Sequence, residues 1–421
     1  KSMEQNVILN AKDSDPEKLK WMMGFPPEKE KIISAKDGSF FEFPALRYSV
    51  NHMREFFPTR GVSAAKTDLY KFRHDLDKKI DEITFVPWNV SSTSPMTFAE
   101  SLEKNYVDGI IIMHNEKIVY EKYFGGLESD GLHAAMSVTK SVTGLLATIL
   151  IAEKMIHPEK PIEFYIPELA NSGFAGATVQ QILDMTTAIK YSEDYNDPKA
   201  EIWEFSNAGN VYHSEKAKGP KSYYEYLPTV QKLENQKHGE VFGYKTVNAE
   251  IVGWLISKVT GRTVADLLSE LVWKPMGATY DAFFQLDSAG KDFAGGGLDM
   301  NLRDMALLGE MIRNEGYINH KQVIPKKAAK ELFGGGSVEA FEKGEEYPSL
   351  KGWSYHNLWW MTNNKHGAFM ARGVHGQAIY IDPVAKMVIA RFSSNPLSSN
   401  KFIDPLSIPA YEAVADYLVK K

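Results

Sequence analysis

The sequence contains no cysteine, and this absence excludes disulfide bonds, thiolate metal ligands and a cysteine nucleophile. Long hydrophobic runs are also missing, since the longest, near residues 145–152, is too short to span a bilayer. No Gly-x-Ser-x-Gly segment occurs, which argues against an α/β-hydrolase. The histidines form no His-Glu-x-x-His segment and no ligand-like spacing with carboxylates, so we predict no metal and no cofactor.

An excess of positive charge is lacking as well. The chain has 48 Lys and Arg against 54 Asp and Glu, a formal net charge of −6, and no basic block interleaved with aromatics, which argues against nucleic-acid binding. Its 421 residues, 43% hydrophobic and 24% charged, are typical of a soluble globular protein with a large core. The polar start, Lys1 to Asn6, is no signal peptide, and we expect a soluble protein of the cytoplasm or periplasm with no membrane partner.

Strand-like segments lie toward both ends of the chain, and helical periodicity fills the middle. Residues 1–105 are rich in loops. We predict strands at 108–113, 118–124, 378–381 and 387–392, and helices at 179–185, 250–259, 263–272, 302–314 and 409–418. This order indicates one sheet built from both ends of the chain, with a helical insertion between them.

Met136-Ser137-Val138-Thr139-Lys140 is the most informative segment. Residues three apart share one helix face, so Lys140 can hold its amine beside the Ser137 hydroxyl at the start of an apolar helix. Helix N-terminal N–H groups lie at the same place, so the segment supplies both a base and part of an anion site for a serine nucleophile. Four other Ser-x-x-Lys segments lack this helical context, and the alternative for Ser137 is a helix N-cap.

Two further segments offer the remaining parts of such a site. Tyr244 precedes a predicted helix and is followed by Lys245, whose positive charge is expected to ease loss of the phenol proton, so that Tyr244 could shuttle a proton. The glycine-flanked segment 371–377 lies just before a strand and could offer backbone N–H groups to a substrate carbonyl. The alternatives are a packing tyrosine and a plain loop. His133 and His375 are near the site in sequence and could line it, although a lone histidine is more often structural.

These residues resemble a known family, the serine β-lactamases and penicillin-binding proteins, in the class C and esterase branch. Within it the chain is similar to the 6-aminohexanoate-dimer (nylon oligomer) hydrolases. The segments that carry the resemblance are 21–27, 47–49, 120–125, 133–140, 183–187, 191–195, 243–248 and 376–377. They are spread over most of the chain.

The resemblance implies a fold and residue roles. The fold is α+β: an α/β sandwich domain with an antiparallel sheet, from residues 1–155 and 345–421, and a mainly helical domain, 156–344, with the active site between them. Ser137 would be acylated, while Lys140 and Tyr244 move its proton. Which of the two is the first base stays open. The N–H groups of Ser137 and Val374 would form the oxyanion hole, and Tyr195 would close over the bound amide.

Departures from the family pattern concern the substrate. Class C β-lactamases carry Tyr-x-Asn and Lys-Thr-Gly, whereas this chain has Thr246 and Ala371-Arg372-Gly373 at these places. Arg372 is expected to replace the missing lysine only in part as a substrate-binding residue, so efficient β-lactam hydrolysis is not expected. Ser206 falls near the place of an acidic residue that would hold the ammonium of the aminohexanoate dimer. We therefore expect low amide activity on the dimer and dominant esterase activity.

Three functional hypotheses stay open. The first is a serine hydrolase that cleaves a small-molecule amide or ester through an acyl-enzyme. The second is a β-lactamase or D-amino-acid peptidase that recognises penicillin. The third is a non-catalytic binding protein that keeps the fold. The natural substrate and the assembly, for which a homodimer is one option, do not follow from the sequence.

Overall fold

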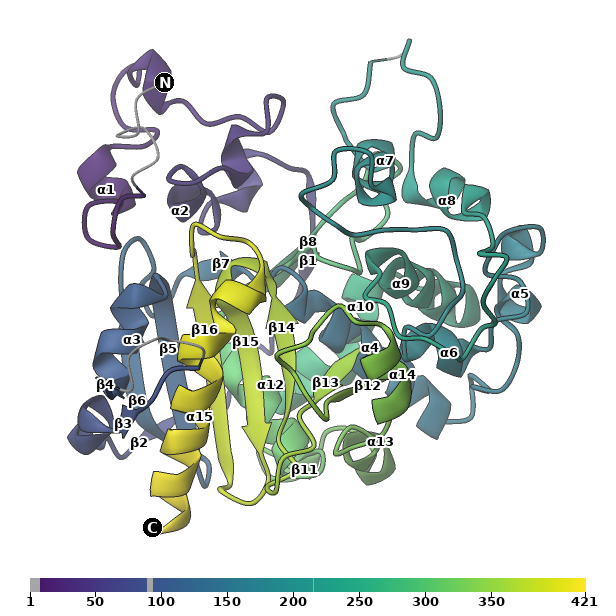
Figure 1. Cartoon of the computed structure of the whole chain (residues 1–421). Helices are drawn as coiled ribbons and strands as arrows, with labels where there is room; N and C mark the ends of the chain where they lie inside the picture. Colours follow the sequence, from purple (N-terminus) through teal and green to yellow (C-terminus); the bar gives the residue numbers. More distant parts are fainter. Residues whose placement is uncertain (1–7, 89–93, 215) are drawn as a thin grey trace.

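A computed structural model describes residues 8–88, 94–214 and 216–421 (Figure 1). The polar start of the chain, residues 1–6, lies outside the described residues. In the described part the main sheet has eight strands in the order β12-β13-β14-β15-β16-β5-β6-β2. In that order they are Ser354–His356, Trp359–Met361, Phe369–Gly373, Gln377–Asp382, Met387–Ser393, Val107–His114, Lys117–Tyr123 and Arg73–His74.

The centre of the main sheet joins the two ends of the chain. β5 and β6 form a hairpin whose turn residues, Asn115 and Glu116, both have positive φ, as a tight two-residue hairpin turn requires. β16 then pairs antiparallel with β5, placing Ile111 opposite Ala390. The predicted strands at 108–113, 118–124, 378–381 and 387–392 are therefore confirmed, as is their union in one sheet.

Helices cover both faces of this sheet (Figure 1). One face carries α4 and α12, which contact β13 to β16, and the other carries α3 and α15. These helices are Val138–Ala152, Leu302–Arg313, Phe98–Lys104 and Asp404–Val419. Because both faces are covered, β5 and β16 are buried along nearly their whole length. The last helix begins at Asp404, earlier than the predicted Pro409, which lies inside it.

The helical part lies on the right of Figure 1. Its helices α5 to α11 are Ile162–Tyr165, Val179–Leu183, Glu201–Ala208, Tyr223–Tyr226, Thr246–Thr260, Val264–Leu268 and Lys274–Met276. The predicted helix at 263–272 is confirmed, but its second half, Ser269–Trp273, is π-helical and continues directly from α10. α9 packs against both α4 and α6, so it connects the helical part to the sheet layers.

The predicted extent of the helical domain, 156–344, needs a correction at α12. This helix packs on β15 and β16, and its Gly309 is so close to the sheet that an added Cβ would lie 2.7 Å from Val388. It therefore belongs to the sheet layers. A second sheet, in the order β1-β8-β9-β7, leads into α12 and comprises Thr59–Val62, Ala282–Gln285, Leu298–Asn301 and Leu132–Ala134.

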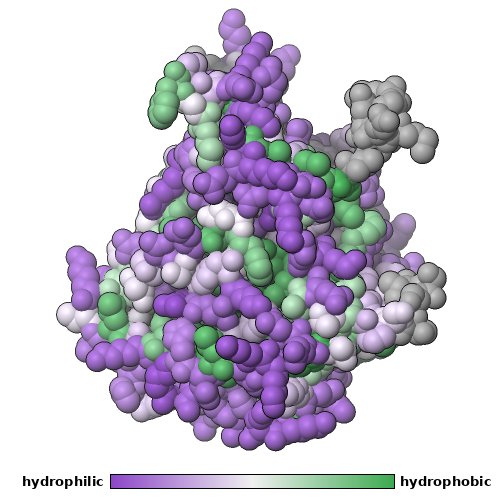
Figure 2. All heavy atoms as spheres, turned by 90° about the vertical axis from the view of Figure 1, so that its left-hand side faces the viewer, coloured by the Kyte–Doolittle hydropathy of each residue, from purple (hydrophilic) through white to green (hydrophobic). Residues whose placement is uncertain are grey.

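Short elements complete the fold. Two-stranded sheets join β3 to β4 and β10 to β11, and helices α1, α2, α13 and α14 lie in the connections. They are Thr84–Phe85, Met96–Thr97, Tyr317–Ile318, Lys321–Gln322, Pro16–Leu19, Leu46–Ser49, Lys326–Glu331 and Val338–Lys343. The face shown in Figure 2 is largely hydrophilic, with apolar side chains in small separate groups. None of the helices described has both the length and the apolar character needed to cross a bilayer.

Candidate active site

Ser137 lies where β7 enters α4. Met136, just before it, has a φ of 50°, a sparsely populated value for a side chain with a Cβ, and the helix starts at Val138. Thr139 Oγ1 accepts a hydrogen bond from Leu298 N at 3.0 Å, which ties the first turn of α4 to β9. The helix is buried from Val138 to Leu150, so the Ser137 backbone is held on a fixed element.

Lys140 and Ser137 are in direct contact, as the spacing predicts. The Lys140 Nζ donates to Ser137 Oγ and to the carbonyl of Gly295, both at 2.7 Å. Only 1% of Lys140 is exposed, and burial lowers its pKa to about 8, although Glu193 and Glu250 act in the opposite direction. The amine is therefore neutral in a useful fraction of molecules near neutral pH.

Tyr244 joins this pair from the start of α9. Its ring lies 4.9 Å from the Lys140 Nζ and stacks on Trp360 at 5.5 Å between centroids. Burial, followed by the charge of Glu193, raises the pKa of the phenol, and a hydrogen bond with Ser137 only partly offsets this. The expectation that Lys245 would ease ionisation of Tyr244 is wrong, because Lys245 Nζ donates to Gly243 O at 2.8 Å. Tyr244 therefore holds its proton.

Strand β14 passes close to the Ser137 amide. A Cβ added to Gly373 would lie 3.0 Å from Ser137 N and 2.8 Å from Ala135 O, so a glycine is needed for this approach. Val374, the next residue, lines the same cavity as Ser137. The role of the Ser137 and Val374 N–H groups as an oxyanion hole remains a prediction, and this arrangement is compatible with it.

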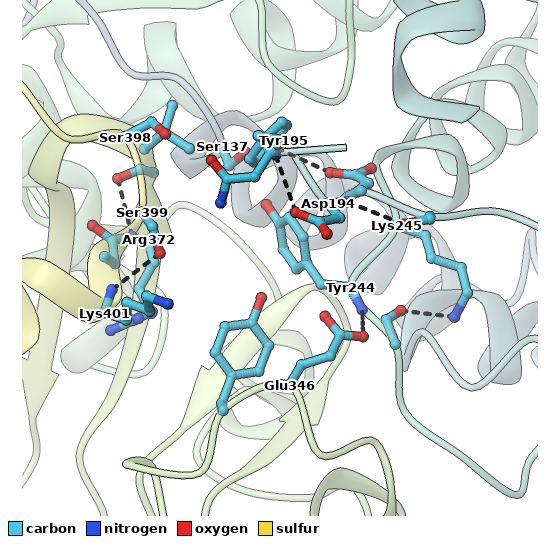
Figure 3. A pocket seen from close by; sticks show the side chains of 18 of the residues that line it. Ser137, Asp194, Tyr195, Tyr244, Lys245, Glu346, Arg372, Ser398, Ser399 and Lys401 are labelled. Carbon is cyan, nitrogen blue, oxygen red and sulfur yellow. Dashed lines mark hydrogen bonds between the residues drawn. The ribbon is translucent and has the colours of Figure 1, made fainter. Parts of the chain in front are cut away.

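The cavity at Ser137 has a volume of about 640 Å³, and its lining is part polar and part apolar (Figure 3). Carboxylates of Glu193, Asp194 and Glu346 line it. The segment after β16, which includes Ser398 and Lys401, forms the opposite wall in Figure 3. A substrate bound here would meet acidic groups on the Tyr244 side.

Tyr195 lines the cavity and is hydrogen-bonded to Glu193. Its hydroxyl donates to Glu193 Oε2 at 3.0 Å, and Tyr191 donates to the other oxygen at 2.7 Å. Glu193 also accepts from the Thr246 N–H and, at 3.1 Å, from its hydroxyl, at the first turn of α9. The loop with Tyr195 is thus held to the helix that follows Tyr244, which agrees with a place for Tyr195 at the substrate.

Arg372 reaches the cavity wall but is not free to bind a substrate carboxylate. Its two terminal nitrogens donate to the two oxygens of Asp404 at 2.8 and 2.9 Å, and 4% of the residue is exposed. Its guanidinium also lies over the rings of Trp353 and Trp360. The expected role as a partial replacement for a substrate-binding lysine is therefore not supported, since Asp404 already occupies the cation.

The two histidines do not reach the cavity. His375 is buried, its Nδ1–H donates to Asn395 O at 2.6 Å, and its ring packs against Phe41. Burial lowers its pKa to about 4. His133 contacts Asp108 at 2.8 Å under the sheet. The expectation that His375 binds substrate needs correction, because its side chain is buried against Asn395 O and Phe41 and does not line the cavity. Ser206 is exposed on α7 and likewise lies outside the cavity lining.

Sequence reasoning missed three residues of the cavity. Glu346 accepts a hydrogen bond from Tyr244 N at 3.2 Å, and burial raises its pKa to about 7. Trp360 supports the Tyr244 ring, and Glu193 connects the loop to α9. Glu193 stood in the resembling segment 191–195 and could have been found there. Within the described residues no group of three or more His, Cys, Asp or Glu side chains is placed to hold a metal ion.

Comparisons with known proteins show the family to which the chain belongs. A family model described as Beta-lactamase matches residues 99–403. The chain is 30% identical to a 6-aminohexanoate-dimer hydrolase of Paenarthrobacter ureafaciens over 358 residues, 85% of this chain and 88% of the relative. A solved structure, a putative 6-aminohexanoate-dimer hydrolase from Bacillus anthracis, matches with a TM-score of 0.82 at 31% identity, covering 94% of this chain and 99% of that one. A family VIII carboxylesterase, 17% identical, matches in fold with a TM-score of 0.55, covering 75% of this chain and 95% of that one.

Proposed function

The chain belongs to the Beta-lactamase family, and from this membership we propose that it is a serine hydrolase that cleaves amide or ester bonds through an acyl-enzyme. One observation carries the proposal: a buried lysine with a pKa of about 8 donates a 2.7 Å hydrogen bond to Ser137 Oγ at the wall of an open cavity. A serine beside such a base is an activated nucleophile.

Acylation begins with proton transfer from Ser137 Oγ to the neutral amine of Lys140. The oxygen attacks the substrate carbonyl, and the resulting oxyanion accepts hydrogen bonds from the N–H groups of Ser137 and Val374. The pKa values support Lys140 as the first base, because its amine is readily neutral while Tyr244 keeps its proton.

Tyr244 completes the cycle as the proton donor to the leaving group. Its phenol gives a proton to the departing nitrogen or oxygen and regains one from the Lys140 ammonium, which becomes neutral again. In deacylation a water molecule loses a proton to the neutral amine of Lys140 and attacks the carbonyl of the acyl-enzyme ester. The ester bond to Ser137 Oγ then breaks, and this oxygen takes the proton back from Lys140. Protons balance over the two steps, and no metal or cofactor takes part.

The relatives support a substrate class. Because two of them are named for the 6-aminohexanoate dimer, we propose linear amides as substrates, together with small esters, which the same acyl-enzyme route can cleave. Esters are easier, because an alkoxide leaves with less help from Tyr244 than an amine does. We propose that esterase activity exceeds amidase activity.

The two alternative functions are less well supported. A β-lactamase or D-amino-acid peptidase would hold a substrate carboxylate with a free cation near β14, and there Arg372 is paired with Asp404. A putative D-alanyl-D-alanine carboxypeptidase of Escherichia coli matches only 41% of this chain, at 24% identity. A binding protein without activity would have no use for the Ser137–Lys140 contact.

The test compares the purified protein with its Ser137→Ala variant on p-nitrophenyl butyrate and on the linear 6-aminohexanoate dimer. We expect the wild type to cleave the ester and, more slowly, the dimer, and the variant to lose about 10³-fold or more in kcat. Mass spectrometry of the wild type during ester turnover should find one acyl group on Ser137.

Ser63→Ala is the matched control. Ser63 also begins a Ser-x-x-Lys segment, but it is exposed and lies outside the cavity lining. We expect this variant to keep kcat near the wild-type value. An active Ser137→Ala protein, or a wild type inert toward both substrates, would show that Ser137 is not the nucleophile.

A further inference from the structure

A buried ion pair lies behind the site, outside the residues that line the cavity. Lys291 Nζ donates to Glu250 Oε2 at 2.6 Å, and the side chains of Glu250 and Lys291 are 0% and 3% exposed. Removing two charges from water is unfavourable, and an apolar pair of similar volume is often equally stable. The mechanism proposed above makes no use of either residue, so the pair calls for another explanation.

The pair connects to Lys140 through the backbone of one residue, Gly295. The second oxygen of Glu250, Oε1, accepts from Gly295 N at 2.7 Å. The carbonyl of the same residue, Gly295, accepts from Lys140 Nζ at 2.7 Å, and that Nζ donates to Ser137 Oγ. Short hydrogen bonds on the two sides of the Gly295 backbone thus link Lys291 and Glu250 to Lys140 and the Ser137 hydroxyl.

The backbone around Gly295 is held between α4 and α9. Thr143, on α4, donates from its hydroxyl to Ala294 O at 2.8 Å. On the α9 side, a Cβ added to Gly295 would lie 2.6 Å from Thr246 Cγ2, which shows how closely this backbone packs on the first turn. Glu250 lies one turn further along the same helix. A shift of Gly295 would therefore remove one of the two partners that orient the lysine amine.

We propose that Glu250 and Lys291 are positioning residues for the base: they fix the backbone at Gly295, and the Gly295 carbonyl aims the Lys140 amine at Ser137. This inference rests on the proposed function, since it assigns a task only if Lys140 takes the Ser137 proton. The pair touches neither substrate nor reacting atoms. The pair acts mainly on the position of the Lys140 amine, and it also acts on the pKa of that amine through the Glu250 charge.

The charge effect has a definite direction. Glu250 and Glu193 both stabilise the ammonium and so raise the pKa of Lys140 against the effect of burial. The phenol of Tyr244 also faces this amine. Around the pair itself the charged or titratable groups are Asp287, Asp292, Tyr223 and Tyr224. Loss of the Glu250 carboxylate should therefore make Lys140 neutral at lower pH.

The test uses two double variants that differ in one hydrogen-bond acceptor. Glu250→Met/Lys291→Met replaces the pair with apolar side chains, so no buried charge is left alone, but Gly295 N loses its acceptor. Glu250→Gln/Lys291→Met keeps an amide oxygen for Gly295 N. On p-nitrophenyl butyrate we expect the first variant to lose about 100-fold in kcat with little change in KM, because a small misplacement of a catalytic group has that effect. The second should recover most of kcat.

A matched control is available on α12. Glu310 there accepts a hydrogen bond from Glu116 N at 2.7 Å and forms an ion pair with Arg313, and the two side chains are 0% and 9% exposed. Like Glu250, Glu310 is thus a buried carboxylate that holds both a backbone N–H and a cation, but it lies far from Ser137 in the chain. Glu310→Met/Arg313→Met should keep wild-type kcat. Thermal unfolding of every variant reports stability separately from rate.

The single variant Glu250→Gln gives a second measurement if the apolar double variant does not fold. Its kcat/KM should reach the plateau at lower pH than in the wild type, and Glu310→Gln should show no such movement. A folded Glu250→Met/Lys291→Met protein with wild-type kcat and pH profile would overturn the positioning role. Lys140→Ala separates the two claims: if that variant stays active, the proposed mechanism itself fails.

Discussion

At the scale of single residues, the site places two proton carriers in environments that act on them in opposite ways. Burial destabilises the Lys140 ammonium and makes the amine a base, with a pKa of about 8. The same burial, together with the negative charge of Glu193, keeps the Tyr244 phenol protonated. Pairs of groups whose pKa values are driven apart define the base and the acid of a mechanism. In the proposed mechanism Lys140 is then the base and Tyr244 the acid.

A pH profile tests this assignment. Because only the neutral amine accepts the Ser137 proton, kcat/KM for p-nitrophenyl butyrate should rise with pH and level off above the Lys140 pKa of about 8. Two other groups that line the cavity could give the same rising limb of the profile: Lys245, whose pKa burial lowers to about 8, and Glu346, whose pKa burial raises to about 7. The rising limb should stay in place in Lys245→Met and in Glu346→Gln. A limb that disappears in one of these variants would assign it to the group replaced.

At the scale of elements, the position of α4 depends on a glycine. A Cβ on Gly144 would lie 2.1 Å from Asn357 O and 2.8 Å from Leu358 Cβ, between β12 and β13. A backbone carbonyl in a packed turn has little room to move. The glycine therefore allows the helix that begins at Ser137 to lie against the edge of the main sheet.

Gly144→Ala should lower the free energy of unfolding by about 1–3 kcal/mol, because the helix must move away from this turn. The better helix propensity of alanine, about 1 kcal/mol, offsets part of the loss. Gly309→Ala on α12 is the comparison, since there a Cβ meets the side chains of Val388 and Ile379, which can shift. Urea unfolding should rank Gly144→Ala as the less stable variant, and the reverse order would contradict this account.

The elements also explain which parts of the site the sequence could predict. Ser137 and Lys140 are three residues apart on one helix, so their contact follows from helix geometry alone. Lys245 misled the prediction for Tyr244, because neighbours in an extended segment point in different directions and this lysine turns toward Gly243 O. Adjacency in the chain is not adjacency in space.

Contacts between distant segments could not be predicted from residue patterns. Arg372 looked like a substrate-binding cation, and its partner Asp404 comes 32 residues later at the start of α15. Glu346 reaches Tyr244 N across 102 residues, with no local signal in its loop. The fold class and the sheet from both chain ends were predicted, because alternating and apolar strand patterns are local. The place of α12 was not, since an amphipathic helix does not reveal what it covers.

At the scale of the whole molecule, a buried neutral histidine couples stability to pH. His375 is 3% exposed, and burial lowers its pKa to about 4, while a histidine in the unfolded chain titrates near 6.5. Between these values the unfolded chain binds a proton that the folded protein does not bind. Folded His375 therefore makes the protein less stable as pH falls through this range.

His375→Asn should remove this dependence. Asparagine tolerates the positive φ of 66° at this position, so the backbone can stay as it is. From about pH 6.5 down to 4, the wild type should lose up to about 1.4 kcal/mol per pH unit relative to the variant, as measured by urea unfolding. His157→Asn, at an exposed position, should run parallel to the wild type. Parallel curves for His375→Asn would mean that the buried imidazole is already charged.

The pairing of β5 with β16 has a consequence for how the protein is made. A ribosome releases Val107–His114 long before Met387–Ser393, and the strand that passes the Ser137 amide, Phe369–Gly373, also emerges late. Until then the β5–β6 hairpin has an open, apolar edge, and such edges favour aggregation of nascent chains. A protein cut short between Tyr244 and β14 would carry Ser137, Lys140 and Tyr244 and still lack the wall that faces them. We therefore expect activity only from chains whose translation has passed β14.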